Sequence, residues 1–403
     1  MRRWRILVGL AVLVILTAAV ADRTGSSGSF VRTVEVGKQP SSIAVSAATG
    51  RVFVANGDSN TVSVLDANSG LLLRTIAVGI HPGAIATDAR GGCVVVANQG
   101  GSVSVLDARD GRLLRTIGLH RDAYGAVDFI PQALAVDEGS GRVFITGNGG
   151  RVGVLDRCAA KAAGAIDGLP PTASGGTIAV DSRTGYAFVV NSMDPGSGST
   201  VNVLDGRRTT TTRSILVSQG AQDVAVDART GAVFVIGQAG VDLLDRGGER
   251  VARTIPVRSV YGETLLDERR GRLFVGTISG GITALGARDG RVLFTRSLGL
   301  FPGSPLAEDQ RRGRVYVCTG GTILTLDPRD GARRGAIPVR GCDGGMAVDE
   351  RTGYLFVANG DDPVAASTPW SWLPSWLRQR LPADVGPAPT SGNGSVSVYD
   401  PAR

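Results

Sequence analysis

The feature that most constrains this chain is a unit of four short apolar segments, which the sequence repeats from residue 30 almost to its end. The unit is clearest from Ile43 to Gly79, IAVSAATGRVFVANGDSNTVSVLDANSGLLLRTIAVG. Each segment predicts a β-strand because it is short, rich in Val, Ile and Thr, and bounded by Gly, Asp, Asn or Ser. We name the strands A, B, C and D; in this copy they are IAVS, RVFVAN, VSVLD and RTIAV.

Eight copies of strand A align, and successive copies begin 40 to 49 residues apart. A period of about 40–50 residues with four strands per unit is typical of a β-propeller. The sequence therefore predicts an all-β fold, a single propeller of eight four-stranded antiparallel blades. Seven blades are the alternative if a weaker copy, such as those near Thr264 or Leu306, is absorbed elsewhere. The copies of strand A begin at Ile43, Ile85, Leu134, Ile178, Val224, Thr264, Leu306 and Met346.

The two ends of the repeat array complement each other. The last copy has strands A, B and C and then stops, whereas Phe30 to Gly37, FVRTVEVG, is a D strand without a copy of its own. This strand matches LLLRTIAVG at Leu71 to Gly79. We expect it to complete the last blade and close the ring, which removes sheet edges that would otherwise pair with other chains.

Composition limits the classes of partner. The chain has 403 residues, of which 42% are hydrophobic and 20% charged, so it can bury a large core. Its formal charge is +7, and Arg2, Arg3 and Arg5 contribute three of these charges. Elsewhere Arg alternates with Asp and Glu in the turns, and no basic surface patch of the kind that binds nucleic acid is expected. The sequence predicts a monomer that binds no nucleic acid and carries no cofactor.

The N-terminus has the pattern of an export signal. A basic segment, Met1 to Arg5, precedes the apolar run Ile6 to Val20, and Ala19-Val20-Ala21 matches a cleavage site. Residues 1–21 are therefore a signal peptide or, if uncleaved, an N-terminal anchor; residues 22–29 are a flexible linker and residues 30–403 form the propeller. Either alternative places the propeller outside the cytoplasm, secreted, periplasmic or at the cell surface; membrane contact is expected only through residues 6–21, and only if this segment is uncleaved.

The repeat resembles a known family. Gly37 to Asp66 contains Gly-x-x-Pro-x-x-Ile-Ala-Val, Thr-Gly-Arg-Val-Phe-Val-Ala-Asn and Asn-Thr-Val-Ser-Val-Leu-Asp, and this pattern is similar to the YVTN β-propeller repeat. The resemblance implies a bacterial or archaeal surface or periplasmic propeller, usually with seven blades. The motif Asn is present at Asn56, Asn98, Asn191 and Asn359 but replaced at Gly147, Gly237, Thr277 and Thr319, so a repeated binding site on this residue is not expected.

The loops divide between two faces of the predicted ring. The A–B and C–D turns, which we call the uniform face, are short and nearly all alike, for example DARTG and DARDG. In these turns the leading Asp should accept hydrogen bonds from backbone N–H groups while the Gly adopts a positive φ. The B–C and D–A loops form the opposite, variable face, and this face carries the long insertions: His120 to Gln132, Ser192 to Thr200 and Gly360 to Gly394.

Long loops in compact domains are usually functional, so the variable face is the predicted binding site. Within the last insertion, TPWSWLPSWLRQRLP at Thr368 to Pro382 has the spacing of a short amphipathic helix. The helix has three interpretations: a cap over the channel mouth, an anchor for a partner or ligand, or a segment that enters a membrane surface. The candidate binding residues are His120, Arg121, Asp122, Tyr124, Asp128, Asp361, Asp362, Trp370, Trp372, Trp376, Arg378 and Arg380.

The sequence offers no catalytic or metal-ligating motif. His81 occupies the place of Gln39 in the first copy and is expected to be a structural loop residue. The patterns G-x-S-x-G, H-E-x-x-H and C-x-x-C are absent from the sequence. The predicted function is an exported module that binds or scaffolds a protein, glycan or envelope component through the variable face. The alternative is a propeller hydrolase of the lactonase type that acts on a lactone or sugar ester.

The four cysteines also divide by face. Cys318 and Cys342 fall on the variable side and predict one disulfide, and Cys93 and Cys158 fall on the uniform side and predict a second. Export permits disulfides. The alternative in each case is a pair of buried free thiols.

Overall fold

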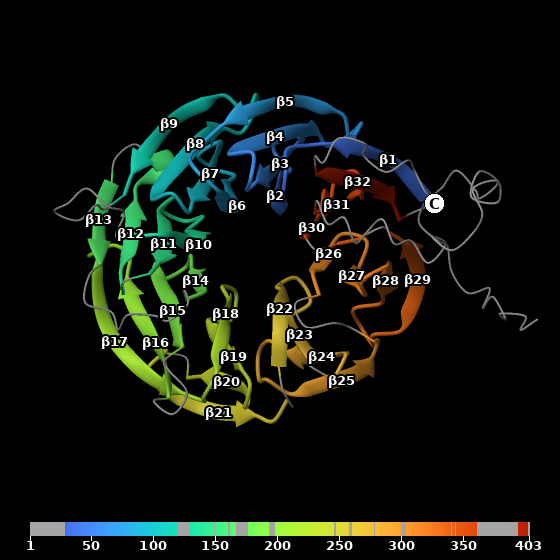
Figure 1. Cartoon of the computed structure of the whole chain (residues 1–403). Coiled ribbons are helices and arrows are strands. Elements are labelled where there is room, and N and C mark those ends of the chain that lie inside the picture. The colour runs from blue at the N-terminus through green and yellow to red at the C-terminus, as the bar shows by residue number, and fades with distance from the viewer. Residues whose placement is uncertain are drawn as a thin grey trace, which may run out of the picture.

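The computed structural model is a ring of eight four-stranded antiparallel sheets around a central axis (Figure 1). The structure describes residues 29–119, 129–148, 150–159, 162–166, 176–192, 198–245, 247–257, 260–277, 279–299, 304–339, 341–342, 344–360 and 394–401. The prediction of an all-β propeller is confirmed, and the number of blades is eight and not seven. In the described part of the chain, no helix has the length and apolar character needed to span a bilayer.

The blades follow one another in chain order, and each runs from strand A at the axis to strand D at the circumference (Figure 1). Blades 1 to 4 are β2(Pro40–Ser46), β3(Arg51–Asn56), β4(Thr61–Asp66), β5(Leu72–Ala77); β6(Pro82–Asp88), β7(Cys93–Asn98), β8(Ser102–Asp107), β9(Leu113–Gly118); β10(Pro131–Val136), β11(Val143–Gly147), β12(Val152–Leu155), β13(Ala162–Ile166); and β14(Ile178–Asp181), β15(Tyr186–Ser192), β16(Ser199–Asp205), β17(Thr210–Val217). A 3-10 turn, η1(Arg157–Ala159), lies between β12 and β13.

Blades 5 to 8 continue the same order. Their strands are β18(Ala221–Asp227), β19(Ala232–Gly237), β20(Gly240–Leu244), β21(Val251–Ile255); β22(Val260–Asp267), β23(Arg272–Thr277), β24(Gly281–Gly286), β25(Val292–Ser297); β26(Leu306–Asp309), β27(Arg314–Cys318), β28(Thr322–Leu326), β29(Arg333–Pro338); and β30(Met346–Val348), β31(Leu355–Asn359), β32(Ser395–Asp400), with β1(Ser29–Glu35) as the outer strand of blade 8.

The first strand of the chain closes the ring as the sequence predicts. β1 pairs antiparallel with β32, from Ser29 opposite Asp400 to Glu35 opposite Ser395. The rings of Phe30 and Tyr399 meet edge to face with their centroids 5.8 Å apart. Hydrogen bonds across this pair satisfy the edge of β32, so the last blade has the same four strands as the others.

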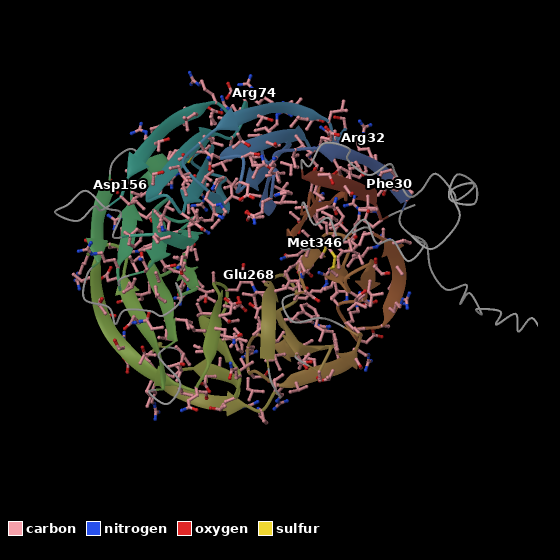
Figure 2. All side chains as sticks on the ribbon, in the orientation of Figure 1. Phe30, Arg32, Arg74, Asp156, Glu268 and Met346 are labelled. Carbon is pink, nitrogen blue, oxygen red and sulfur yellow. A yellow bond between two sulfur atoms is a disulfide. The ribbon has the colours of Figure 1, made fainter. Side chains whose placement is uncertain are left out.

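The core lies between successive blades and is built from strands B and C. Val52, Val54, Val62 and Val64 have no exposed surface, whereas the D-strand residue Ile76 is only partly buried. The outer strands are less covered than the inner ones, as the exposed residues of β5 show. Blades diverge toward the circumference of a ring, so residues on strand D are exposed; in Figure 2, Arg74 on β5 lies at the outer margin, whereas Glu268 and Met346 lie at the inner one.

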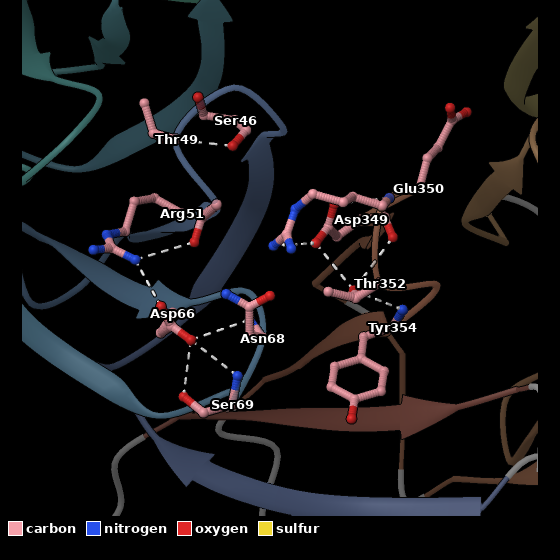
Figure 3. Close-up of polar contacts among 12 residues, drawn as sticks. Ser46, Thr49, Arg51, Asp66, Asn68, Ser69, Asp349, Glu350, Thr352 and Tyr354 are labelled. Carbon is pink, nitrogen blue, oxygen red and sulfur yellow. Dashed lines mark hydrogen bonds and ion pairs between the residues drawn. The ribbon is translucent and has the colours of Figure 1, made fainter.

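The uniform face is held by its turn aspartates, as predicted. Asp349 Oδ1 accepts a hydrogen bond from the N–H of Arg351 at 3.1 Å, and its Oδ2 accepts one from the Thr352 hydroxyl at 3.0 Å (Figure 3). Asp66 Oδ1 likewise accepts bonds from the N–H and hydroxyl of Ser69. The glycines of these turns have positive φ, for example 64° at Gly50 and 85° at Gly353. The turn residues are therefore structural.

Arginines of the uniform face also join neighbouring blades, which spacing within one copy does not predict. Arg312 in the A–B turn of blade 7 donates to the carbonyls of Glu350 and Thr352 in blade 8, at 2.9 and 3.0 Å. Arg270 in blade 6 donates to the Gln310 carbonyl of blade 7 at 2.9 Å. These contacts clamp successive blades at the end of strand A.

Candidate functional site

All twelve candidate binding residues lie outside the described part of the chain. They fall in residues 120–128 and 361–393, and the prediction of a Trp-bearing helix falls there as well. The structure does describe the chain on both sides of each segment, and these flanks establish where on the ring each insertion begins and ends.

The first insertion spans the seam between blades 2 and 3 on the variable face. On one side, the Leu119 N–H donates to the Gly101 carbonyl in the B–C turn of blade 2 at 2.9 Å. On the other side, the Ile130 N–H donates to Asn148 Oδ1, in the B–C turn of blade 3, at 2.5 Å. The adjacent Phe129 is 3% exposed and packs in the core between these blades. Both ends are thus fixed by B–C turns of the variable face.

The last insertion emerges where blade 8 meets blade 1. Asn359 and Ser395 pair across the β31–β32 ladder, and Asn359 Nδ2 donates to Ser395 Oγ at 3.1 Å. The Val36 N–H donates to the Gly394 carbonyl at 2.9 Å, and the Gly394 N–H donates to the Gly37 carbonyl at 3.2 Å. Because Gly37 leads into blade 1, the base of this insertion is tied to the connection between the last and first blades.

A hydrogen-bonded corner lies between the first and last insertions, where blade 1 connects to blade 2; we define the blade 1–2 corner as Asp58, Asn60, Ile80 and His81. His81 Nδ1 lies 3.6 Å from Asp58 Oδ1, and the His81 N–H donates to Asn60 Oδ1 at 2.7 Å. The Ile80 and His81 carbonyls accept from Gly100 and Gln99. Ile80 is 66% exposed. The corner therefore presents an apolar side chain beside a His–Asp pair on a fixed backbone.

The repeated Asn of strand B is structural. Asn98 is fully buried, and its Nδ2 donates to the hydroxyls of Ser102 and Ser104 at 3.1 and 3.0 Å. Asn56 and Asn359 make the same pair of bonds to the start of strand C. In blade 7, the Thr319 hydroxyl closes the hairpin instead by donating to the Thr322 carbonyl at 2.8 Å. In these three copies the motif Asn thus holds the B–C hairpin together at the variable face, whereas the side-chain amide atoms of Asn191 have no hydrogen-bond partner among the described residues.

Two carboxyl groups on inner strands have perturbed pKa values, and no sequence motif singles them out. Burial raises the pKa of Asp223, whose Oδ2 accepts from the Thr264 hydroxyl and whose Oδ1 accepts from the Val224 N–H at 2.8 Å. Burial, followed by the effect of the neighbouring Asp267 carboxylate, raises the pKa of Glu308 to about 9. Glu308 stands where five other copies have Val, and an alignment of the copies would have revealed it.

These carboxyls do not form a joint site. Asp223 lies four residues before the A–B turn of blade 5, whereas Glu308 lies next to the A–B turn of blade 7. In the residues that the structure describes, the one group of three side chains able to ligate a metal is Asp88, Cys93 and Cys158. No convergent set of carboxylates of the kind a metal-dependent hydrolase needs is present among them.

A cleft of about 530 Å³ opens on the uniform face between blades 5 and 6. Its acidic residue, Asp245, accepts hydrogen bonds from the N–H groups of Glu249 and Arg250, and the first of these bonds lowers the pKa of its carboxyl. The Asp245 carboxylate thus accepts hydrogen bonds from the backbone of its own turn. The cleft is lined by Thr230, Ala232, Leu243, Leu244, Asp245, Ala252 and Arg288.

Both pairs of cysteines are joined by disulfides. Cys318 at the end of β27 is bonded to Cys342 in the connection to blade 8, with 6.3 Å between their Cα atoms. Cys93 at the start of β7 is bonded to Cys158 in η1, with 5.7 Å between their Cα atoms. The first bond links blade 7 to the approach of blade 8, and the second links blade 2 to blade 3.

Comparisons with known proteins agree with the fold. A sequence model of the family described as outer membrane protein assembly factor BamB matches residues 20–201 and 237–334, more than half of the chain. A search of curated proteins gives no match. Among solved structures, Kuenenia stuttgartiensis hydrazine synthase superposes with a TM-score of 0.52 at 14% identity, over 81% of this chain and 94% of that one. At this identity the similarity concerns the fold alone.

Proposed function

Because this chain belongs to the family described as outer membrane protein assembly factor BamB, we propose that it is an exported, non-catalytic propeller that binds or scaffolds a protein, glycan or envelope component. The binding surface is the variable face. The family description names an assembly factor, a role that needs a docking surface and no reaction chemistry.

The observation that carries the proposal is the difference between the two faces. On the uniform face, the turn aspartates and many arginines already bond to their own turns or to the next blade. On the variable face, the first and last insertions are tied at their bases to B–C turns or to the blade 8 to blade 1 connection, with the blade 1–2 corner between them. Binding and catalytic residues are commonly carried by loops that a rigid scaffold positions.

The finer parts of the proposal rest on sequence. The pattern from Gly37 to Asp66 resembles YVTN repeats, whose proteins are exported, and residues 1–21 have the form of a signal peptide or anchor. Two disulfides are in keeping with an oxidising compartment. The lactonase-type alternative has no observation in its favour among the described residues, since their carboxyls do not converge.

The test combines a loop deletion with site-specific crosslinking. Asn359 pairs with Ser395, so a short turn can replace residues 361–393 and leave both the ladder and the Gly394 hydrogen bonds in place. A photo-crosslinking residue is placed at Ile80 on the variable face or, as the matched control, at exposed Ala47 on the uniform face. We expect crosslinked partners in envelope extracts from position 80 and not from position 47, and their loss in the folded deletion variant. Equal crosslinking at both positions, or a folded deletion variant that retains all partners, would refute the proposal.

A further inference from the structure

The seam between blades 2 and 3 is joined differently from four other seams. In those, an Arg at the start of strand B donates to a carbonyl in the C–D turn of the following blade. Arg51 donates to the Arg109 carbonyl at 3.1 Å, and Arg142, Arg272 and Arg314 donate to the carbonyls of Gly206, Pro328 and Pro401. Blade 2 has Cys93 at this position, and the residue it reaches across the seam is Cys158. A sulfur pair thus takes the place of the arginine bond.

The aspartate beside this pair has an unsatisfied oxygen. Asp88 has no exposed surface; its Oδ1 accepts from the Gly91 N–H at 2.8 Å, and its Oδ2 has no hydrogen-bond partner among the described residues. In four other copies, the equivalent oxygen is paired with an Arg of its own turn, at 2.9 Å from Arg312 in the case of Asp309. A buried carboxylate oxygen without a partner is destabilising, so its presence needs an explanation.

Gly91 provides the space in which oxygen and sulfur meet. A Cβ on Gly91 would collide with Asp88 Oδ2 and would lie 2.7 Å from Cys158 Sγ. Every other copy has a side chain at this position. These residues are Thr49, Ser140, Thr184, Thr230, Arg270, Arg312 and Thr352.

The backbone on the opposite side of the seam is also unusual. Cys158 has φ 49° and ψ 28°, a left-handed conformation that is unfavourable for a residue with a side chain. This conformation holds its Sγ 3.2 Å from the Gly91 carbonyl. One ligand atom from each of Asp88, Cys93 and Cys158 lies within 4.8 Å of the others. Three independent departures from the repeat, at residues 91, 93 and 158, therefore converge on Asp88.

We propose that Asp88, Cys93 and Cys158 form a Zn²⁺ site when the Cys93–Cys158 disulfide is reduced, so that a disulfide and a metal ion are alternative links across the same seam. Two thiolates and a carboxylate suit Zn²⁺, which accepts sulfur and oxygen ligands in a tetrahedral set. The three protein ligands leave one position for water. The unpaired Asp88 Oδ2 becomes a ligand in the metal-bound state.

The redox step is balanced by an external dithiol. Two electrons and two protons from this reductant break the bond between the Cys93 and Cys158 sulfurs, and the reductant leaves as its own disulfide. Zn²⁺ then binds the two thiolates, and both thiol protons are released to solvent. With Zn–S bonds of about 2.3 Å, the two sulfurs separate to about 3.8 Å in a tetrahedral site. Rotation about the cysteine side chains can supply this separation without a break in β7 or η1.

The second disulfide provides an internal control. Among the described residues, no third metal-ligating side chain is grouped with Cys318 and Cys342. Reduction of this pair should expose thiols without creating a metal site. A second control is Asp227, another fully buried turn aspartate whose Oδ2 lacks a partner among the described residues, but which is not grouped with any sulfur.

The experiment uses Co²⁺ as a spectroscopic probe in full-length protein carrying Cys318→Ser and Cys342→Ser. After anaerobic reduction, we expect a thiolate-to-Co²⁺ charge-transfer band that saturates at one ion per chain and is abolished by excess Zn²⁺. Asp88→Asn should weaken Co²⁺ binding at least tenfold, Cys93→Ser should abolish the band, and Asp227→Asn should leave it unchanged. Absence of the band, or a band indifferent to Asp88→Asn, overturns the proposal.

A second measurement, of thermal stability, tests the proposal without the substituted variants, any of which could fail to fold. Excess Zn²⁺ should raise the unfolding midpoint of the reduced protein by about 2 °C or more and leave that of the oxidised protein unchanged, because only the reduced form offers the site. Equal midpoints of the reduced protein with and without Zn²⁺ also overturn the proposal.

Discussion

Replacement of Glu308 should remove a pH dependence from the stability of the ring. The Glu308 side chain is 3% exposed, its Oε1 lies 3.4 Å from Arg270 Nη1, and its Oε2 has no partner among the described residues. Burial raises the pKa of this carboxyl to about 9, with smaller upward contributions from Asp267 and Glu350 against the downward contribution of Arg270. The carboxyl is therefore protonated in the folded protein at neutral pH.

The sign and size of the effect follow from linkage. In the unfolded chain Glu308 ionises near the ordinary glutamate pKa of 4.5, whereas in the fold it retains its proton up to about pH 9. The folded state thus binds more protons between these values, so stability is fully present below pH 4.5 and is lost as pH rises toward 9. Each pH unit in this window costs up to about 1.4 kcal/mol. With allowance for solvent screening, we expect Glu308 to remove about 2 kcal/mol of stability between pH 5 and pH 7.

The assay is equilibrium urea unfolding of wild type and Glu308→Gln at pH 5 to 8. Gln keeps the shape and a hydrogen-bond donor but does not titrate, so the variant should show a flatter pH dependence and should exceed wild type in stability at pH 8. Glu35→Gln, which changes an exposed carboxylate on β1, is the matched control and should retain the wild-type slope. Parallel curves for wild type and Glu308→Gln would show that Glu308 is ionised in the fold and would refute the reasoning.

Three further outcomes are expected. Asn98→Ala removes both bonds that close a B–C hairpin and should cost about 1–3 kcal/mol in urea unfolding, whereas exposed Gln99→Ala should be within about 0.5 kcal/mol of wild type. Arg312→Met leaves the buried Asp309 carboxylate unpaired and should raise amide exchange at the blade 7–8 seam more than at other seams, as read by hydrogen-exchange mass spectrometry. Deletion of residues 1–35 exposes the edge of β32 and should yield oligomers in size-exclusion chromatography, which a synthetic peptide of β1 should reverse.

The ring and its closure could be predicted from sequence because the unit is repeated and its ends are incomplete. Strand A recurs eight times, and the D strand at Phe30 to Gly37 has no other blade to join than the last. The turns of the uniform face could also be predicted, since a leading Asp and a Gly with positive φ act within a few residues of each other. Local chemistry that recurs in every copy is what a sequence pattern detects.

Contacts between blades required the structure. Arg51 follows an A–B turn and Arg312 lies within one, so the two residues look alike in sequence. Arg51 nevertheless donates to the C–D turn of the next blade, whereas Arg312 donates to the A–B turn of the next blade. Which carbonyl an Arg reaches depends on the distance between neighbouring blades, and the sequence of one copy does not contain that distance. The exposure of the outer strands has the same origin, because the divergence of blades with radius is a property of the ring.

The arrangement of the candidate binding residues could not be predicted from the repeat, because an insertion has no counterpart in the other copies. His120 and Trp372 lie in segments whose ends the repeat fixes and whose interior it does not. Alignment of the copies places Gly101 and Asn148, which flank the first insertion, and Asn359, which precedes the last. The structure ties the insertions to the ring at these residues.

Departures from the repeat differ in whether the structure compensates for them. Thr319 replaces the strand-B Asn and closes the hairpin with its own hydroxyl, so this departure is neutral for the fold. Glu308 and Gly91 are different, since Glu308 has a buried oxygen without a partner and Gly91 lacks a side chain beside another such oxygen, Asp88 Oδ2. A fold built from eight copies could satisfy these positions as the other copies do, with Val, Arg or Thr. At Glu308 the cost of burial is reduced because the carboxyl is protonated in the fold, and at Asp88 the proposed metal ion would give the oxygen a partner.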